Sequence, residues 1–411
     1  MGTIIFLLIL FSIDIYFYMG TSSIAYKIFG NKLMYKIIYW FICIVVYIGI
    51  IYVIFTYNKT TPSIRFNNNI IYSSLFFILF VSKFFGSLIL MFDDILRFFK
   101  ITFNLIGLSK HPYDLGRLKF LKQTALLFSG ALFSTLLIGM KWGRYKFKKN
   151  YQNIVIKNWP AALNNYKIAQ ISDLHLGSFN SVEKLEYAVK IINNEEPDLV
   201  VFTGDLVNNY YHEALPFIDT LQKIKAKDGK FSILGNHDYC DYVRLKRESK
   251  KWKENFKNLL GIQKKAGFDL LLNESRVVNI KNDKFNIVGV ENWGAGNFNK
   301  DGDLDKAMNS VNQELPTILL SHDPSHWRSI VLKSNYKISL QLSGHTHGMQ
   351  FGIDIPGLKW SPVQYRYKEW GGLYKEGEKQ IYVNRGLGHL GYAGRVGIMP
   401  DISILNIKSQ I

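Results

Sequence analysis

The stretch IAQISDLHL at residues 168–176 decides how the rest of this chain is organised. Its apolar first half predicts a short buried strand, after which the chain turns. Asp173 and His175 follow at the end of that strand, on the same face of an extended segment. Carboxylate and imidazole groups both bind divalent metals, so the stretch predicts a strand that ends at a ligand site.

Four later clusters repeat this design of an apolar strand, a small Gly or Ser residue and then polar residues. They are VVFTGDLVN at 200–208, FSILGNHD at 231–238, TILLSHDP at 317–324 and LQLSGHTHG at 340–348. Helices are predicted between the strands, at 184–197, 214–227 and 243–266. This alternation indicates an α/β fold, in which ligand sites lie at the carboxyl ends of strands. We therefore expect all five clusters to meet at one site.

The clusters supply carboxylate, imidazole and amide groups but no cysteine, which suits Zn, Mn or Fe and argues against a structural zinc site. Five of the nine histidines fall in them. The seven candidate ligands are Asp173, His175, Asp205, Asn236, His322, His345 and His347. They exceed what one ion needs. Two divalent ions that share a carboxylate and a bridging water would use them all, and such a pair favours phosphoester hydrolysis.

The first 149 residues are predicted to form a transmembrane helical region, followed by a catalytic domain at 150–411. Apolar runs near 3–20, 34–57, 69–92 and 119–140 are each about the length of 20 residues that a bilayer requires. They show almost no amphipathic pattern, which disfavours the alternative of buried helices in a soluble domain. The first run lacks the basic start and cleavage site of a signal peptide, so a retained helix is expected.

Two charged residues, Asp14 and Lys83, fall inside these apolar runs. Charges at membrane depth are costly, so they face a partner or reach toward water. The two residues can pair with each other. The preferred interpretation is that each lies near a membrane surface and extends its charge to water.

The net charge of +18 does not indicate a nucleic-acid partner. Residues 1–141 hold 13 Lys and Arg against 4 Asp and Glu, which accounts for half of the excess. The other half is spread over 270 residues without an RNP-like or zinc-finger pattern, so no nucleic-acid binding is expected. The basic run KWGRYKFKK at 141–149 favours a cytoplasmic catalytic domain, or a segment attracted to anionic lipid head groups.

The clusters carry a resemblance to a known family. DLH (173–175), GDLV (204–207), GNHD (235–238), SHDP (321–324) and GHTHG (344–348) resemble, in order and spacing, the five signature blocks of calcineurin-like metallophosphoesterases. The resemblance covers residues 150–411, and ISDLHLG with the later GRVGIMPDI is similar to the bacterial YkuE-like branch. It implies a sandwich of two sheets flanked by helices, preceded by about four transmembrane helices as in membrane-anchored members.

The resemblance also implies roles for the cluster residues. One divalent ion would be held by Asp173, His175 and His347, a second by Asn236, His322 and His345, and Asp205 would bridge both. His237 would protonate the leaving-group oxygen or steady the phosphate, and Asp238 would orient the His237 imidazole. The family usually reads GHTHGGQ where this chain has Met349 in place of the second Gly. That difference concerns how closely the loop approaches a substrate.

Other residues are weaker candidates. Arg385, His389 and Arg395 lie in the glycine-rich stretch RGLGHLGYAGRVG at 385–397. They are predicted to contact a phosphate or head group, with an ordinary surface turn as the equal alternative. Trp360, Tyr365, Tyr367 and Trp370 are expected to pack or to form a lipid-facing rim. His111, His212 and His326 are expected to be ordinary surface residues.

The sequence thus predicts a multi-pass membrane phosphoesterase with two divalent ions, which uses a bridging hydroxide to hydrolyse a phosphoester or pyrophosphate bond. The membrane helices suggest a lipid-linked substrate. The branch resembles enzymes that cleave the pyrophosphate of UDP-diacylglucosamine. One alternative is a non-catalytic membrane sensor or scaffold with a vestigial site, which the complete ligand set disfavours. Another is a transporter, which the scarcity of charges within the spans disfavours. No sequence feature indicates an oligomeric state.

Overall fold

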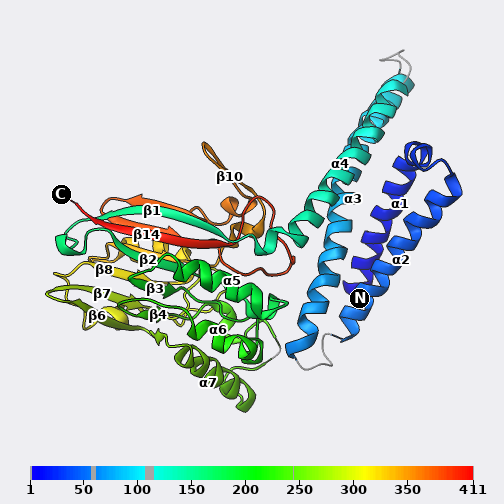
Figure 1. Ribbon diagram of the computed structural model, residues 1–411. Coiled ribbons are helices and arrows are strands. Elements are labelled where there is room, and N and C mark those ends of the chain that lie inside the picture. The colour runs from blue at the N-terminus through cyan, green and yellow to red at the C-terminus, as the bar shows by residue number, and fades with distance from the viewer. Residues whose placement is uncertain (1, 57–61, 107–114, 244, 411) are drawn as a thin grey trace. The chain divides into compact units, whose positions relative to one another are not determined.

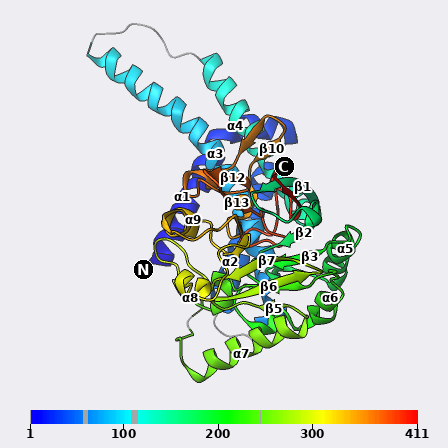
Figure 2. The same ribbon diagram turned by 90° about the vertical axis from the view of Figure 1, so that its left-hand side faces the viewer.

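The chain forms two compact units (Figures 1 and 2). The computed structural model describes residues 2–56, 62–106, 115–243 and 245–410. One unit is built from four long helices, and the other contains the residues from 142 onward.

The first unit confirms the four expected apolar helices. They are α1 (Gly2–Phe29), α2 (Lys32–Thr56), α3 (Pro62–Leu105) and α4 (Leu115–Lys141). Each is long and apolar enough to cross a membrane. Residue 57, the last of the second predicted run, lies outside the described residues. The 44 residues of α3 span about 66 Å, roughly twice the hydrocarbon thickness, so this helix extends past the bilayer.

Asp14 and Lys83 pair with each other inside this unit, so the preferred interpretation of two separate interfacial charges is wrong. Lys83 Nζ lies 2.7 Å from Asp14 Oδ1 and 2.9 Å from Cys43 Sγ, and Tyr47 donates a hydrogen bond of 2.7 Å to Asp14 Oδ2. The ammonium also lies 4.5 Å from the centre of the Tyr39 ring. Both charges are buried, and mutual neutralisation offsets part of their desolvation cost.

Replacing Lys83 with Ala leaves the Asp14 carboxylate buried without its counter-charge. We expect Lys83→Ala to lower the free energy of unfolding in detergent by about 3–5 kcal/mol. Lys36→Ala removes an exposed lysine from the same unit and should change stability by less than about 0.5 kcal/mol. The double variant Asp14→Ala/Lys83→Ala should be less destabilised than the sum of the single variants. Additive losses would contradict the pairing.

The second unit contains two six-stranded mixed sheets. The first sheet has the order β1 (Lys148–Ile156), β14 (Asp401–Ser409), β2 (Tyr166–Ile171), β3 (Leu199–Phe202), β4 (Lys230–Ser232) and β5 (Asp269–Leu270). The second has the order β12 (Gly372–Glu376), β13 (Lys379–Val383), β9 (Leu340–Ser343), β8 (Thr317–Leu320), β7 (Asp283–Gly289) and β6 (Glu274–Ile280). A separate hairpin consists of β10 (Ile353–Ile355) and β11 (Leu358–Trp360).

The two sheets pack face to face, and helices cover both outer faces. Apolar residues from both sheets form one buried cluster between them. A second cluster joins the first sheet to α5 (Val182–Asn193), α6 (Ile218–Gln222) and α7 (Lys250–Lys265), and a third joins the second sheet to α8 (Leu304–Met308) and α9 (Ser325–Ser329). This arrangement confirms the predicted two-sheet sandwich flanked by helices. The helix expected at 214–227 is shorter, because a 3₁₀ turn at Leu215–Phe217 precedes α6 and α6 ends at Gln222.

Strand β2 shows why its sequence is continuously apolar. Ile168 packs into the cluster between the sheets, whereas Ala169 and Ile171 pack toward the helices. Both faces are therefore buried, as is usual where parallel sheets are covered by helices. The polar Gln170 is also buried, and its amide donates 2.9 Å to the Ser343 carbonyl of the other sheet. This bond fixes the two sheets together just behind the polar ends of β2 and β9.

Candidate metal centre

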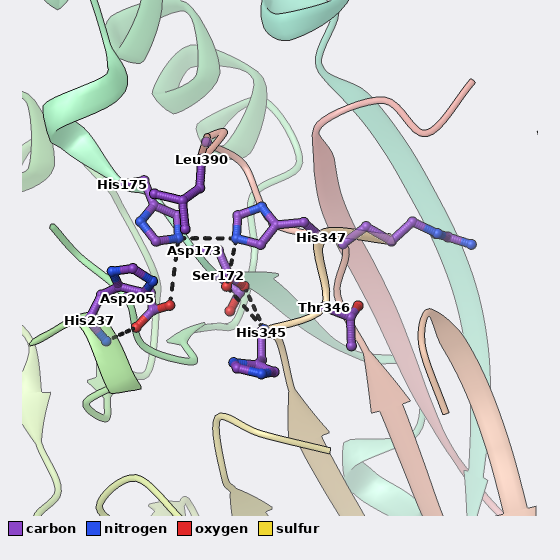
Figure 3. Close-up of polar contacts among 12 residues, drawn as sticks. Ser172, Asp173, His175, Asp205, His237, His345, Thr346, His347 and Leu390 are labelled. Atoms are coloured by element: carbon purple, nitrogen blue, oxygen red, sulfur yellow. Dashed lines mark hydrogen bonds and ion pairs between the residues drawn. The ribbon is translucent and has the colours of Figure 1, made fainter. Parts of the chain in front are cut away.

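Polar side chains from five loops meet at one end of the sandwich. Strands β2, β3 and β4 are parallel neighbours in the first sheet, and β8 and β9 are parallel neighbours in the second. The residues after such strands emerge at the same edge. The sheets are joined there, because the His345 backbone N–H donates 3.0 Å to the Asp173 carboxylate (Figure 3). The structure thus brings together residues 172 positions apart in the sequence, such as His175 and His347.

Asp173, His175 and His347 form the first group of converging side chains (Figure 3). His175 Nε2 lies 3.0 Å from His347 Nε2, which in turn lies 3.2 Å from Asp173 Oδ1. Burial alone would raise the pKa of Asp173, but the neighbouring His347 imidazole brings it below its usual value. The group therefore presents an ionised carboxylate and two imidazole nitrogens to a common point.

Asn236, His322 and His345 form a second group around Asp205. Asn236 Oδ1 lies 3.1 Å from His322 Nε2 and 2.8 Å from His345 Nδ1. Asp205 Oδ2 lies 3.2 Å from His322 Nε2 and 3.6 Å from His175 Nε2 of the first group. Asp205 consequently stands between the two groups.

The hydrogen bonds of His322 show that a cation fits the second group. His322 Nδ1 lies 2.7 Å from the Thr203 carbonyl oxygen, which only accepts, so Nδ1 carries the proton. In the neutral ring, Nε2 then has a bare lone pair that faces two oxygens, Asp205 Oδ2 and Asn236 Oδ1. Burial disfavours a charged ring, yet the carboxylates of Asp205 and Asp173 outweigh it and raise the pKa of His322 to about 10. A divalent ion can take the place of that proton.

The separations between the converging atoms also suit a metal. Bonds of about 2.1 Å to one ion place neighbouring ligand atoms roughly 3.0–3.4 Å apart. The distances from His347 Nε2 to Asp173 Oδ1 and from His322 Nε2 to Asp205 Oδ2, both 3.2 Å, fall within that range. Carboxylate, imidazole and amide oxygen are ligands that Mn, Fe and Zn accept.

The backbone at the centre is held in an uncommon conformation. Non-glycine residues rarely adopt positive φ, and doing so costs of order 1–3 kcal/mol each. Five of the seven candidate ligands do so: Asp173 (51°), His175 (44°), Asp205 (60°), His345 (72°) and His347 (51°). Met349 has φ 51° as well, at the position where the expected motif carries its second glycine. Clustered strain of this kind is characteristic of functional sites.

Comparisons with known proteins agree with this geometry. The profile of calcineurin-like phosphoesterases matches residues 166–349, and a profile described as the transmembrane domain of a probable calcineurin-like phosphoesterase matches residues 1–144. The chain is 32% identical over 256 residues to the metallophosphoesterase YkuE of Bacillus subtilis, covering 61% of this chain and 82% of YkuE. The chain belongs to the calcineurin-like metallophosphoesterases.

Two further relatives bear on the type of protein. Phosphodiesterase YaeI of Escherichia coli is 28% identical over 246 residues, covering 59% of this chain and 82% of YaeI. A transmembrane protein with a metallophosphoesterase domain from Danio rerio is 29% identical over 263 residues, covering 62% of this chain and 56% of that protein. This metallophosphoesterase is therefore a hydrolase, and its four apolar helices make it a membrane protein.

The contacts of His237 and Asp238 correct one expectation. Asp238 does not orient the His237 ring; its carboxylate accepts hydrogen bonds of 2.9 to 3.0 Å from the backbone N–H groups of Asp205, Leu206 and Gly235. Burial and the neighbouring Asp205 charge raise the pKa of Asp238 to about 7. The His237 ring is held by the Asn208 carbonyl oxygen, 2.7 Å from Nδ1. Asp238 therefore shapes the two loops on which the ligands lie.

Two tyrosines belong to the centre, although the sequence analysis did not assign them to it. Tyr367, expected in a packing or lipid-facing role, places its hydroxyl 2.8 Å from His345 Nε2. Tyr242 accepts a hydrogen bond of 2.7 Å from Asn236 Nδ2 and stacks on His237 with ring centres 4.3 Å apart. Such outer contacts orient metal ligands. Tyr367 lies outside every cluster in the sequence, whereas Tyr242 lies only four residues after Asp238, so its nearness to that cluster was the signal that could have found it.

The loop at 385–397 turns its polar side chains inward. Arg395 is fully buried and donates 2.9 Å to the carbonyl oxygens of Arg385 and Gly386, with Nη2 3.2 Å from His347 Nδ1. His389 is also fully buried, and neither ring nitrogen has a hydrogen-bond partner among the described residues. Arg385 pairs with Asp354 at 3.0 Å and with Asp401 at 3.3 Å. Arg395 and Arg385 therefore brace the loop, and none of the three side chains faces solvent.

The remaining weaker candidates divide by burial. His326 is buried, not on the surface: its Nδ1 lies 2.9 Å from Ser321 Oγ, and burial lowers its pKa to about 4. His212 is half-buried, and His111 lies outside the described residues. Trp370 packs in a small apolar cluster, whereas Trp360 and Tyr365 are exposed.

Asp205 is the carboxylate that stands between both groups, so its loss should affect metal binding most. We expect Asp205→Asn to weaken Mn or Zn binding by more than about 100-fold, measured by metal analysis after dialysis. Asp305→Asn removes an exposed carboxylate of the same unit and should leave the metal content unchanged. Full metal content in Asp205→Asn would contradict the assignment of this centre.

Proposed function

We propose that this metallophosphoesterase binds two divalent ions and hydrolyses a phosphodiester or pyrophosphate bond of a lipid-linked substrate. The seven proposed ligands form two sets around one shared carboxylate. One ion would be held by Asp173, His175 and His347, the other by Asn236, His322 and His345, and Asp205 would contact both.

The position of Asp205 is the observation that carries this proposal. Its Oδ2 lies within 3.6 Å of one imidazole nitrogen from each group, His175 Nε2 and His322 Nε2. Asp173, His175 and His347 already offer one ion three ligand atoms within 4.8 Å of one another, and so do Asp205, His322 and His345. A single ion would leave buried ligand atoms of the other group without a counter-charge, which is costly.

The residues around the ligands suit acid catalysis on a phosphoester. When bound, divalent ions of the Mn, Zn or Fe type would stabilise charge on the phosphate and lower the pKa of the water that attacks phosphorus. The bond between His237 Nδ1 and the Asn208 carbonyl fixes the tautomer and leaves Nε2 for the substrate. We assign His237 Nε2 the transfer of a proton to the leaving-group oxygen. Asp238 and Arg395 act as positioning residues for the ligand loops.

The membrane unit supports a substrate that is itself in the membrane. The catalytic unit begins at residue 142, directly after α4, so the chain tethers the metal centre to the bilayer. The relative YaeI is a phosphodiesterase, which supports a phosphodiester bond. UDP-diacylglucosamine, cleaved at its pyrophosphate, is the candidate substrate that the sequence resemblance suggests. The basic run at 141–149 supports a cytoplasmic position for the catalytic unit.

The proposed role of His237 separates catalysis from metal binding. We expect His237→Asn to keep its metal and to lose about 10²–10⁴-fold in kcat for an alkyl phosphodiester. The loss should be smaller for a nitrophenyl phosphodiester, because nitrophenolate leaves without a proton. His212→Asn is the matched control outside the centre and should retain activity. Equal losses with both leaving groups would rule out proton donation by His237.

The substrate proposal is tested with the full chain reconstituted in vesicles containing Mn. We expect kcat/KM for UDP-diacylglucosamine to exceed that for the soluble UDP-N-acetylglucosamine by at least tenfold, about 1.4 kcal/mol of transition-state binding. Cleavage of nitrophenyl phosphodiesters without cleavage of the lipid would contradict a lipid-linked substrate and leave the proposed phosphoesterase activity intact.

The proposed cytoplasmic position of the catalytic unit is tested with a nitrophenyl phosphodiester that cannot cross the membrane. We expect inverted cell-membrane vesicles to cleave it and right-side-out vesicles not to cleave it.

A further inference from the structure

The hairpin of β10 and β11 has the reverse of the amphipathic pattern expected in water. Residues directly opposite each other in an antiparallel pair share one face. Ile353 pairs with Trp360 and Ile355 pairs with Leu358, so one face carries four apolar side chains. Asp354 pairs with Lys359 on the other face. The apolar face is the exposed one, with Ile355 58% and Leu358 50% accessible.

The charged groups of the other face bond to the body of the unit, although Lys359 is itself exposed. Asp354 forms an ion pair of 3.0 Å with Arg385. Lys359 Nζ donates to the Gly371 carbonyl oxygen and lies 4.7 Å from the centre of the Trp370 ring. A soluble hairpin normally buries its apolar side and leaves its charges in water. This hairpin therefore suits a surface that is itself apolar.

The tip of the hairpin continues the apolar character. Pro356 and Gly357 form the turn, with Gly357 at φ 79°, and both are exposed. Tyr365 lies nearby in the sequence and is 80% exposed. Exposed apolar clusters of this kind mark sites of interaction with proteins or membranes. Tryptophan, here Trp360, is enriched where proteins meet the membrane–water boundary.

One packed loop connects the hairpin to the point where the chain leaves the membrane. The 3₁₀ turn η1 (Gly143–Tyr145) follows α4 directly, and its first residue packs tightly against the Arg395 carbonyl. The adjacent Val396 exchanges hydrogen bonds of 2.8 and 3.0 Å with Gln350 and Gly352 at the base of the hairpin. All these contacts lie within the second unit. The hairpin and the 3₁₀ turn that follows α4 in the chain thus contact the same loop.

The charge of the connecting segment agrees with a membrane surface. Lys146 and Lys148 are exposed in the run KWGRYKFKK, which leads from α4 into β1. Basic residues beside a membrane helix are attracted to anionic head groups. A basic segment and an apolar hairpin on the two sides of one loop are complementary to head groups and acyl chains respectively.

We propose that the apolar face of the β10–β11 hairpin inserts into the bilayer that holds the chain's own helices. The proposal does not depend on which bond the enzyme cleaves. It would place the metal centre at the membrane surface, because the hairpin follows η8 (His347–Gln350), the turn that contains the ligand His347. Ser361, just after β11, donates 2.8 Å to the Gly348 carbonyl and fixes the other end of the hairpin to the same turn.

The test uses the full chain in vesicles that contain anionic lipid. Ile355→Cys and Leu358→Cys are each labelled with a polarity-sensitive nitrobenzoxadiazole probe. Asn282→Cys, at the tip of the β6–β7 hairpin, is the matched control. Cys43 and Cys240 are buried, so the unsubstituted chain measures background labelling. Each variant must elute as the unsubstituted chain does and retain its metal content, which excludes misfolding.

We expect the probes at 355 and 358 to shift to shorter wavelength and to be quenched by lipids that carry a doxyl group in the acyl chain. The control probe should remain water-like and unquenched. Probes at 355 and 358 that match the control would overturn the proposal. A blue-shifted probe that doxyl lipids do not quench would show that a second copy or another protein covers the face, and would also overturn it. Neither result would bear on the hydrolase activity.

Discussion

Buried lone pairs that face one another without a proton between them are the constraint on which the catalytic unit depends. A neutral His322 ring has a single N–H group, which donates to the Thr203 carbonyl oxygen. The other ring nitrogen, Nε2, therefore faces Asp205 Oδ2 and Asn236 Oδ1 without a proton. Such an arrangement is unfavourable unless a proton or a metal supplies positive charge. A proton and a metal ion compete for this position, so metal affinity falls as the pH falls. The fold maintains the arrangement in spite of this cost.

The rigidity of the sandwich is what sustains the centre. Strained residues such as Asp173 and His345 persist only where the surroundings over-determine their conformation. Three apolar clusters fill the spaces between and outside the sheets, and close-packed interiors resist deformation. The Gln170 amide bonds one sheet to the other, and Asn384 Nδ2 donates 3.2 Å to the Gln170 backbone carbonyl oxygen. Asp238 gathers backbone N–H groups from two ligand loops at once.

The membrane unit meets the same electrostatic problem in a different way. Asp14 is neutralised by Lys83, a side chain of the chain itself, whereas the carboxylates of the candidate metal centre face imidazole and amide groups that could hold a cation with them. A pair of opposite charges with hydrogen-bonding tyrosines is self-sufficient and suits a structural role. A group of ligand atoms that lacks a counter-charge of its own is not self-sufficient, and it suits a metal site. The hairpin adds a third arrangement, in which the Asp354 carboxylate and the Lys359 ammonium bond to the body of the unit while four apolar side chains are exposed.

The sequence by itself determined the four apolar helices, the strands that lead into the centre and the candidate ligands that follow them. Apolar runs ending in Gly or Ser and then Asp or His are local patterns, and so are the long apolar helices, because burial and turn geometry act on neighbouring residues. Contacts between distant residues needed the tertiary structure. It paired Asp14 with Lys83, moved Asp238 from the His237 ring to the loop backbone, and added Tyr242 and Tyr367 to the centre. The inward direction of Arg395 was likewise decided by packing, because no local pattern specifies which carbonyl oxygens a guanidinium will meet.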